Sequence, residues 1–187
     1  MFRAAFLFYS CAKNRIFLAP KTRVMAEELH VTYLESPLGW LQLTGTRSGV
    51  SEVSFLTEKP TVLNPEIPEC LQDCHQQLSE YFSGRRQNFH LKLDPDGTEF
   101  QQKVWQHLQQ IPFGKTRSYL DIALQLGQPT YTRAVGSANG RNPLAIIVPC
   151  HRVIGSGGQL TGYAGGLWRK KWLLQLEGQP QQTALFN

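Results

Sequence analysis

The strongest constraint on how this chain can fold is a change of hydrophobic pattern at Asp94-Pro95-Asp96-Gly97, a stretch of turn-forming residues. Before it, short segments alternate apolar and polar residues, as strands with one buried face do. After it, apolar residues recur at the three- and four-residue spacing of helices. Because 187 residues suffice for one ordinary domain or two small ones, we predict an α+β protein in which a small sheet-containing domain precedes a helical one.

The first half is predicted to hold a small antiparallel sheet and one helix. Segments 29–33, 40–44 and 49–56 have the composition of strands and are joined by short connections, which favours an antiparallel meander. A helix is expected over 69–82, and an alternating pattern predicts one more strand over 89–93. The apolar side chains of the first predicted strand are Leu29, Val31 and Tyr33.

Two cysteines and a histidine on the predicted helix raise the question of a metal site. Cys70, Cys74 and His75 supply at most three ligands, and no Cys-x-x-Cys pair accompanies them. Their spacing fits the core face of a helix better, so we expect no metal and no cofactor. Four cysteines without a regular framework favour free thiols and a reducing compartment: the cytoplasm, or the nucleus or an organelle in a eukaryote.

The second half is predicted to contain a helix-turn-helix. Thr98 and Gln101 have the spacing of a capping box, so a helix is expected to begin there. Ser118 is the expected cap of a second helix over 119–126, and a short turn leads to a third helix near 131–139. Two helices joined by a tight turn are typical of DNA-binding domains.

The distribution of charge agrees with a DNA partner. Residues 99–187 contain nine Lys and Arg against three Asp and Glu, whereas 25–98 contain five against eleven. An acidic half joined to a basic half indicates that only the second half meets a polyanion; a basic face that is merely solvated is the alternative. No apolar run approaches the length of a membrane helix, so no membrane interaction is expected.

The two ends differ from the rest of the chain. Residues 1–24 contain five Lys and Arg and no acid, which is compatible with a targeting presequence. We favour an over-extended reading frame instead, because Met25 and the residues after it form a natural start. A polar tail occupies 179–187. Between the ends, we predict an N-terminal domain over 25–94 and a C-terminal domain over 95–178.

A thiol stands beside an imidazole where an apolar run ends. The β-branched run 146–148 predicts a short buried strand, which Pro149 would terminate. Cys150, His151 and Arg152 follow directly. Because the thiolate is the reactive form and nearby positive charge favours it, the pattern indicates a nucleophile. A half-buried structural cysteine is the alternative.

The third predicted helix has unusually small side chains, among them Ala134, Gly136 and Ser137. Glycine costs helix stability, so either tight packing on a neighbour or close approach to a nucleic-acid backbone is expected. Arg133 stands alone among these small residues and is a candidate phosphate contact.

Together these motifs resemble the methylated-DNA–protein-cysteine methyltransferases, which are the O6-alkylguanine-DNA alkyltransferases. The stretch Pro149-Cys-His-Arg-Val-Ile-Gly155 resembles the active-site signature of that family. The likeness is dense over about 98–178 and looser over about 28–97, where Ser36-Pro-Leu-Gly39 is the clearest match. Further matching segments are Arg133–Gly140, Asn142-Pro143, Thr161–Gly166 and Leu173–Gly178.

The resemblance implies direct repair of DNA in which Cys150 takes the alkyl group from O6-alkylguanine, with O4-alkylthymine as a further candidate substrate. His151 would be the base, acting through one water, and Glu177 would orient its imidazole. A carboxylate at a helix C-terminus opposes the helix dipole, which is an independent sign that Glu177 has a specific role. Because a thioether has no acid–base route back to a thiolate, each molecule would act once.

The resemblance also implies roles for residues around the nucleophile. Asn142 would brace the thiolate, although an ordinary Asn-Pro turn is the alternative. Tyr119 would donate a proton to the guanine oxygen, with a packing aromatic as the alternative. Arg133 would fill the space left by a flipped-out base, and Tyr163 would stack on that base. The other base- and groove-contacting residues would be Val153, Ala164, Ala134, Gly136 and Ser137.

The expected partner is therefore double-stranded DNA that contains alkylated guanine, bound by a monomer. The alternative function is a non-catalytic protein that binds alkylated DNA, and such relatives typically carry tryptophan in place of the nucleophile. The presence of Cys150 argues against it. A Cys-His hydrolase is a third possibility, which the helix-turn-helix disfavours. Trp168 lies beside the active-site loop and could narrow the pocket for larger alkyl groups.

Overall fold

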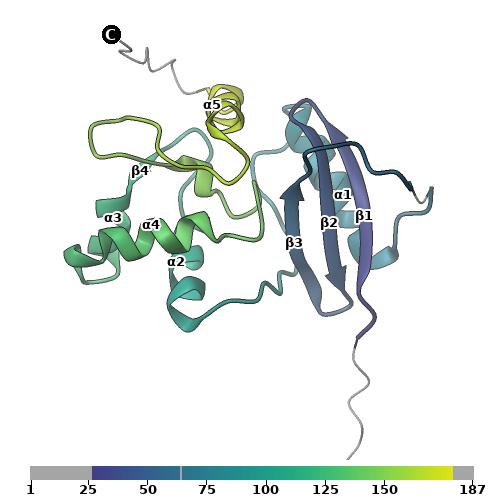
Figure 1. Ribbon diagram of the computed structural model, residues 1–187, viewed down its shortest axis with the longest axis horizontal. Coiled ribbons are helices and arrows are strands. Elements are labelled where there is room, and N and C mark those ends of the chain that lie inside the picture. The colour runs from purple at the N-terminus through teal and green to yellow at the C-terminus, as the bar shows by residue number, and fades with distance from the viewer. Residues whose placement is uncertain (1–26, 64, 179–187) are drawn as a thin grey trace, which may run out of the picture.

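The computed structural model describes residues 27–63 and 65–178, which form a sheet-containing part and a helical part side by side (Figure 1). The predictions for 1–24 and 179–187 lie outside the described residues. Within the described part of the chain, no helix is both long and apolar enough to cross a membrane.

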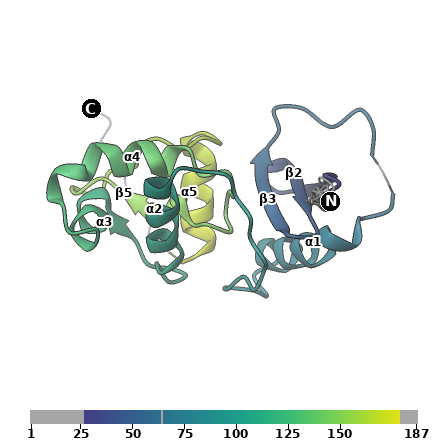
Figure 2. The same cartoon turned by 90° about the horizontal axis from the view of Figure 1, so that it is seen from below.

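The first part is a three-stranded antiparallel meander, as predicted. Strands β1 (His30–Ser36), β2 (Gly39–Thr46) and β3 (Gly49–Phe55) follow one another in the order β1-β2-β3. Gly39 adopts φ +100°, which only glycine enters readily, and the Ser36 hydroxyl donates to its carbonyl at 2.6 Å. Figure 2 shows helix α1 (Glu69–Phe82) lying against one face of this sheet.

The buried face of β1 differs from the prediction. The alternation over 29–33 suggested an apolar face that includes Val31, yet Val31 is 36% exposed. The buried side chains are Thr32 and Leu34, and Leu34 pairs across the sheet with the buried Leu41. Both faces of β1 carry large side chains, so the alternating pattern alone does not show which face is buried. The buried face is the one that packs against α1.

The segment 89–93 is not a strand, so the prediction of a fourth strand in this half is wrong. Only Leu93 makes an isolated bridge, to Val50 of β3. The side-chain amide of Gln77 replaces a neighbouring strand: it accepts from His90 N at 2.8 Å and donates to His90 O at 2.9 Å. Apolar side chains still alternate toward the core here, but the backbone pairs with the Gln77 side chain and, around Leu93, with the single residue Val50, whose N donates to Lys92 O and whose O accepts from Asp94 N, each at 2.9 Å.

The second part is helical, and both capping boxes are present. Thr98 caps α2 with Gln101, and Ser118 caps α3 with Asp121. The short 3-10 turn η1 leads into α4, which completes the helix-turn-helix. The elements of this part are α2 (Glu99–Gln109), β4 (Arg117–Ser118), α3 (Tyr119–Gln125), η1 (Pro129–Tyr131), α4 (Thr132–Gly140), η2 (Cys150–Arg152), β5 (Val153–Ile154) and α5 (Leu167–Leu176).

The run before the cysteine is buried but is not a strand. Residues 146–148 form turns, with Ile147 N donating to Ala145 O at 2.8 Å. Ile146 has φ +72°, a left-handed conformation that β-branched residues rarely adopt. An apolar run predicts burial, which is correct here, but does not by itself fix the backbone. The consequence is a tight buried bend that delivers the chain to η2.

The two parts are joined by backbone pairing as well as side chains. Val53 in β3 donates from its N to Pro143 O at 2.8 Å and accepts from Ala145 N at 2.9 Å. Arg169 of α5 donates from Nε to Leu38 O at 2.8 Å. A single cluster of buried apolar residues runs through both parts. The edge of the first sheet therefore braces the bend that precedes the cysteine.

Candidate active site

Cys150 is the first residue of η2, and its side chain is only 6% exposed. Asn142 Nδ2 donates to its sulfur at 3.1 Å and to Val148 O at 2.8 Å. The orientation of this amide is determined, since its Oδ1 accepts from Leu144 N at 3.0 Å. Asn142 thus fixes both ends of the buried bend and points its N–H at the sulfur.

The surroundings of the thiol act in opposite directions. Burial raises the pKa of Cys150 above its ordinary value. The hydrogen bond from Asn142 and the charge of Lys170 work against this rise, because both favour the thiolate. The net direction is upward, so the resting group is a thiol, and a base has to take its proton before it can act as a nucleophile.

His151 is completely buried, and its Nε2 lies 2.9 Å from Oε1 of Glu177. Burial lowers the pKa of His151, although Glu177 works in the opposite direction. A neutral imidazole next to an ionised carboxylate must carry its proton on Nε2, which leaves Nδ1 as an acceptor. Within the described residues, Nδ1 has no hydrogen-bond partner.

Glu177 is the C-cap of α5 and is 4% exposed. Burial alone would raise its pKa, but the hydrogen bonds and charges of His151 and Arg152 outweigh burial and lower the pKa to about 2. The carboxylate also accepts from Tyr81 Oη at 2.8 Å and from Gly114 N at 3.1 Å. An ionised Glu177 is thus held from four sides.

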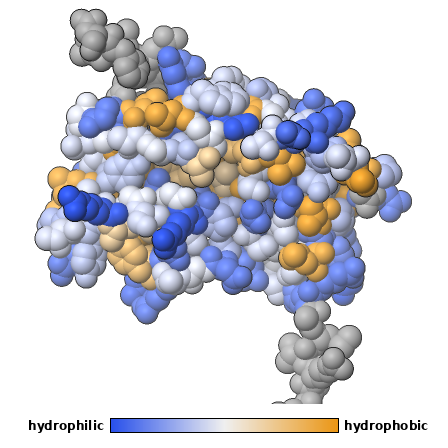
Figure 3. Space-filling view, viewed as in Figure 1, coloured by the Kyte–Doolittle hydropathy of each residue, from blue (hydrophilic) through white to orange (hydrophobic). Residues whose placement is uncertain are grey.

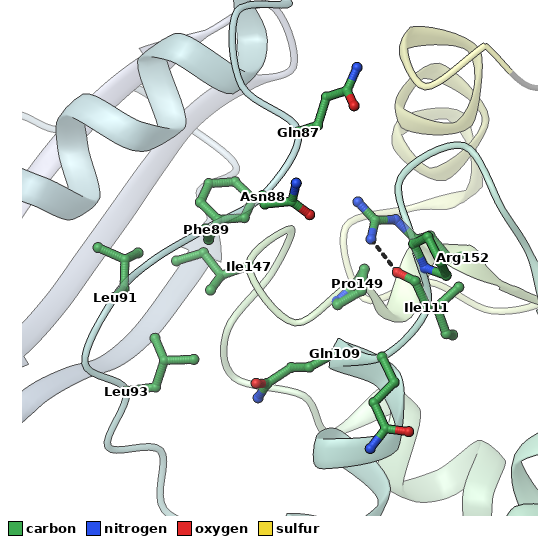
Figure 4. A pocket seen from close by; sticks show the side chains of 12 residues that line it. Gln87, Asn88, Phe89, Leu91, Leu93, Gln109, Ile111, Ile147, Pro149 and Arg152 are labelled. Atoms are coloured by element: carbon green, nitrogen blue, oxygen red, sulfur yellow. Dashed lines mark hydrogen bonds between the residues drawn. The ribbon is translucent and has the colours of Figure 1, made fainter.

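Arg152 supports this carboxylate. Its Nε and Nη2 donate to the two oxygens of Glu177, each at 2.9 Å, and its Nη1 donates to Ile111 O at 2.6 Å. Figure 4 shows the bond to Ile111 at the edge of a pocket of about 350 Å³ between the two parts of the molecule. Because Arg152 is buried and donates to Glu177 and Ile111, its geometry fits structural support of the carboxylate and does not fit a contact with a DNA phosphate.

A second pocket, of about 170 Å³, lies against the nucleophile. Cys150 and Asn142 form one side of it, and the loop residues Tyr163 and Ala164 form another. The Tyr163 ring packs edge-on against Phe55 of β3, 6.3 Å between centroids. The structure therefore brings Tyr163 and Ala164, which the resemblance predicted to contact the base, to the cysteine, and it adds strand β3 of the first part as a wall that the sequence did not suggest.

The predicted DNA-contacting residues lie mainly on α4. Arg133, Ala134 and Ser137 are exposed on this helix, and Gly136 is half-buried. Strongly hydrophilic side chains protrude over the region of α3 and α4 (Figure 3). These residues form an outward face and do not line the pocket next to the cysteine. They are available to a partner along the whole helix.

Two further predicted residues lie between these regions. Tyr119 is the first residue of α3, and its hydroxyl accepts from Thr161 Oγ1 of the active-site loop at 3.1 Å. Val153 is buried, and its carbonyl accepts from Lys170 Nζ at 2.6 Å. Among the described residues, these hydrogen bonds go to Thr161 and Lys170 and not to the sulfur, so the proposed roles of Tyr119 and Val153 depend on where a substrate lies.

Two family models together match residues 29–95 and 99–179. The first is the 6-O-methylguanine DNA methyltransferase, ribonuclease-like domain, and the second is the 6-O-methylguanine DNA methyltransferase, DNA binding domain. The chain belongs to the methylated-DNA–protein-cysteine methyltransferase family. The family resemblance predicted from the motifs is thereby confirmed.

Individual relatives agree with this assignment. A methylated-DNA–protein-cysteine methyltransferase of Methanosarcina acetivorans is 48% identical over 154 residues, which cover 80% of this chain and 99% of the relative. A methylated-DNA–protein-cysteine methyltransferase of Mycobacterium tuberculosis is 47% identical over 165 residues, which cover 85% of this chain and 99% of the relative. The crystal structure of Mycobacterium tuberculosis OGT in complex with DNA matches with a TM-score of 0.72 and 49% identity, covering 79% of this chain and 92% of that one. The chain thus acts in DNA repair by alkyl transfer to a cysteine, with DNA as its partner.

Sequence reasoning missed two functional neighbours of this methyltransferase site. Lys170 is fully buried, and burial lowers its pKa to about 8. It shares the buried face of α5 with Leu173 and Leu174, so a lysine at an apolar position of the helix was the available signal. Tyr81 had no such signal, because an aromatic on the core face of α1 is ordinary packing.

The cysteines of α1 belong to the core of this family member. Cys74 is fully buried, and burial raises its pKa to about 12. Across 27–63 and 65–178, no group of three or more His, Cys, Asp or Glu side chains is placed to hold a metal ion.

Proposed function

We propose that the chain removes the alkyl group from O6-alkylguanine in double-stranded DNA and transfers it, once per molecule, to Cys150. One observation carries the proposal. The buried sulfur is held by Asn142 at 3.1 Å on the wall of a pocket, next to His151, whose Nε2 is bound by Glu177. This arrangement leaves a neutral imidazole with one free acceptor beside a thiol that needs a base.

The chemistry is a displacement at the alkyl carbon. Nδ1 of His151 accepts the thiol proton through one water, and Asn142 stabilises the thiolate by hydrogen bonding. The sulfur–carbon bond forms as the carbon–oxygen bond breaks, and the guanine oxygen leaves with the electron pair. Tyr119 supplies the proton that this oxygen gains and is reprotonated from solvent. The His151 imidazolium returns its proton to solvent, so the net proton passes from thiol to guanine. The thioether product ends the reaction.

The flipped base is proposed to occupy the pocket next to the cysteine. Tyr163 would stack on it, the Ala164 amide would bond its oxygen, and the Val153 carbonyl would accept from its amino group. A methylated guanine pairs poorly, which lowers the cost of extruding it from the duplex.

The exposed face of α4 is proposed to lie along the minor groove. The small residues Ala134, Gly136 and Ser137 permit close approach of the helix to the DNA backbone. Arg133 would enter the stack where the base has left. The exposure of these side chains supports this placement, since none of Arg133, Ala134 and Ser137 is used in the core.

We further propose two domains over 25–94 and 95–178, a monomeric protein and a cytoplasmic location, or a nuclear or organellar one in a eukaryotic cell. The free thiols of Cys70, Cys74 and Cys150 support a reducing compartment. Sedimentation of the protein with and without a short duplex measures the oligomeric state, and a dimer in either condition would contradict the proposed monomer.

The decisive experiment measures the intact mass of the protein after mixing with a duplex that carries one O6-methylguanine. We expect one added methyl group, located on Cys150 by peptide mapping, with no further addition at excess duplex. Cys150→Ser should gain none, and Cys70→Ser, which changes another thiol, should gain one. Binding of the duplex without any gain of mass would support the non-catalytic alternative. A duplex with O4-methylthymine tests the further candidate substrate.

A further inference from the structure

The N-terminal part contributes one polar group to the buried cluster of the active site. Tyr81 of α1 is fully buried, and its hydroxyl donates to Oε1 of Glu177 at 2.8 Å, across 96 positions of sequence. Burial, together with the charge of Glu177, raises the pKa of Tyr81 above its ordinary value, so the phenol remains a donor at any working pH. This hydroxyl is therefore a permanent hydrogen-bond partner of the carboxylate that holds His151.

Three donors converge on the same oxygen of Glu177. Oε1 accepts from Tyr81 Oη at 2.8 Å, from His151 Nε2 at 2.9 Å and from Arg152 Nη2 at 2.9 Å. A carboxylate oxygen offers about two lone-pair positions. The phenol and the imidazole therefore share acceptor capacity, and each weakens the bond that the other makes. Oε2 is occupied separately by Arg152 Nε and Gly114 N.

We propose that Tyr81 is a positioning residue for alkyl transfer: its hydroxyl fixes the Glu177 carboxylate and limits the hold of that carboxylate on the Nε2 proton of His151, so that the imidazole stays neutral with Nδ1 free to accept. The inference rests on the proposed function, in which His151 is the base. It assigns a chemical role in the reaction to the N-terminal part of the chain.

The hydroxyl and the ring of Tyr81 make different contacts, so their roles can be tested separately. The ring packs against Phe82, Phe89 and Phe113, with centroid separations of 5.5 to 6.3 Å. A phenylalanine at this position can make the same contacts, so packing alone does not require the oxygen. Within the described residues, the one hydrogen bond of this oxygen goes to the Glu177 carboxylate. Tyr81→Phe therefore removes the proposed role and keeps the packing.

The charged and titratable groups around the His151–Glu177 pair determine the expected direction of the effect. Without the phenol, Oε1 is a stronger acceptor for His151 and stabilises the imidazolium, which raises the pKa of His151. Arg152 and Lys170 oppose the imidazolium in both proteins, so the difference reports the hydroxyl. The groups facing the pair are Tyr81 from α1, Cys150 and Arg152 from η2, and Lys170 from α5.

The test is the single-turnover rate of methyl transfer as a function of pH, measured for the wild type and Tyr81→Phe. Transfer needs neutral His151, so the rate falls as the pH drops through its pKa. In Tyr81→Phe we expect this fall to begin about one pH unit higher, which makes the variant about tenfold slower on the acid side. The alkaline plateaus should agree within about threefold. Coincident pH profiles would overturn the proposal.

A matched control keeps the Tyr81 hydroxyl and weakens a neighbouring contact between α1 and α5. Phe82 packs against Trp172 of α5, 6.1 Å between centroids. Phe82→Leu should lower the unfolding temperature and leave the midpoint of the pH profile unchanged. An equal shift of that midpoint in Phe82→Leu would mean that docking, and not the hydroxyl, controls His151, and would overturn the proposal.

A second readout does not depend on transfer. The His151 resonance of the free protein can be followed by NMR against pH, assigned by its absence from His151→Gln. We expect its titration to move upward in Tyr81→Phe and not in Phe82→Leu. If the wild type takes no methyl group at Cys150, the proposed function fails while this titration still tests the hydroxyl. If the wild type transfers normally and neither readout moves, only the role of Tyr81 is wrong.

Discussion

The catalytic cluster and the face of α4 solve opposite problems within one small protein. Around Glu177, buried groups are paired in advance: His151, Arg152 and Tyr81 all donate to one carboxylate. On α4, Arg133 and its small neighbours are exposed and make no comparable internal network. Reaction geometry is thus set before DNA arrives, since buried polar groups are costly unless paired. In the proposed function, recognition of DNA is left to these exposed side chains.

The largest effect is expected from a substitution in the buried cluster. Glu177→Gln removes the charge that Arg152 and His151 share and leaves a buried guanidinium without its carboxylate. We expect a loss of stability of about 3 kcal/mol and a fall in transfer rate of about 100-fold. Urea unfolding and single-turnover transfer measure the two effects. Glu99→Gln, at an exposed surface pair, is the control and should change neither.

The pH dependence of the unfolding free energy tests the same ionised carboxylate. The pKa of Glu177 is lowered in the folded state to about 2, so its contribution is complete above its unfolded value near 4.5 and is lost as the pH falls toward 2. His151 adds loss at higher pH, because its lowered pKa means that the unfolded chain takes a proton first below about 6.5. We expect Glu177 alone to account for about 3 kcal/mol.

Urea unfolding between pH 7 and pH 3 measures about 2 kcal/mol of this loss, because the remainder falls between pH 3 and the folded pKa of about 2. In Glu177→Gln the part of the curve below pH 4.5 should be flatter than in the wild type. Parallel curves for the two proteins would contradict the assignment of the ionised carboxylate.

Asn142→Ala separates chemistry from binding. The variant loses the N–H that lies 3.1 Å from the sulfur, so the thiolate is less favoured. We expect transfer to slow by about 10- to 100-fold, because a hydrogen bond to a charged group is worth roughly 1.5–3 kcal/mol. Affinity for an O6-methylguanine duplex, measured by fluorescence anisotropy on a Cys150→Ser background, should be unchanged. A parallel loss of affinity would show that Asn142 acts on the fold of the site.

The smallest effect on stability is expected from a substitution on the exposed face of α4. Arg133→Ala should weaken binding to DNA by about 1 kcal/mol and reduce the salt dependence of binding by about one charge. Its unfolding free energy should stay within about 0.5 kcal/mol of the wild type, because the side chain is exposed. Anisotropy titrations at several salt concentrations and urea unfolding check these values. Arg85→Ala, in the acidic half, is the charge-matched control and should leave DNA binding unchanged.

Much of the fold was predictable because its signals are local. The capping boxes at Thr98 and Ser118 fix two helix starts through contacts three residues apart, and both are present. The alternating segments before residue 56 predicted the meander for the same reason. The strand predictions over 89–93 and 146–148 were wrong. Segment 89–93 pairs with the Gln77 side chain and with one residue of β3, which is too little for a ladder, and 146–148 form a turn.

The sequence by itself determined the family, because the matching motifs are local, and it predicted Cys150 as the nucleophile with His151, Asn142 and Glu177 around it. Only the tertiary structure decided how these groups meet and added Tyr81 and Lys170 to them. Glu177 meets His151 from 26 positions away and Tyr81 reaches Glu177 from 96 positions away. Such contacts arise when separate elements pack around a shared buried charge. The hydrogen bonds that this charge requires do not produce a periodic pattern in the sequence, so they cannot be predicted from it.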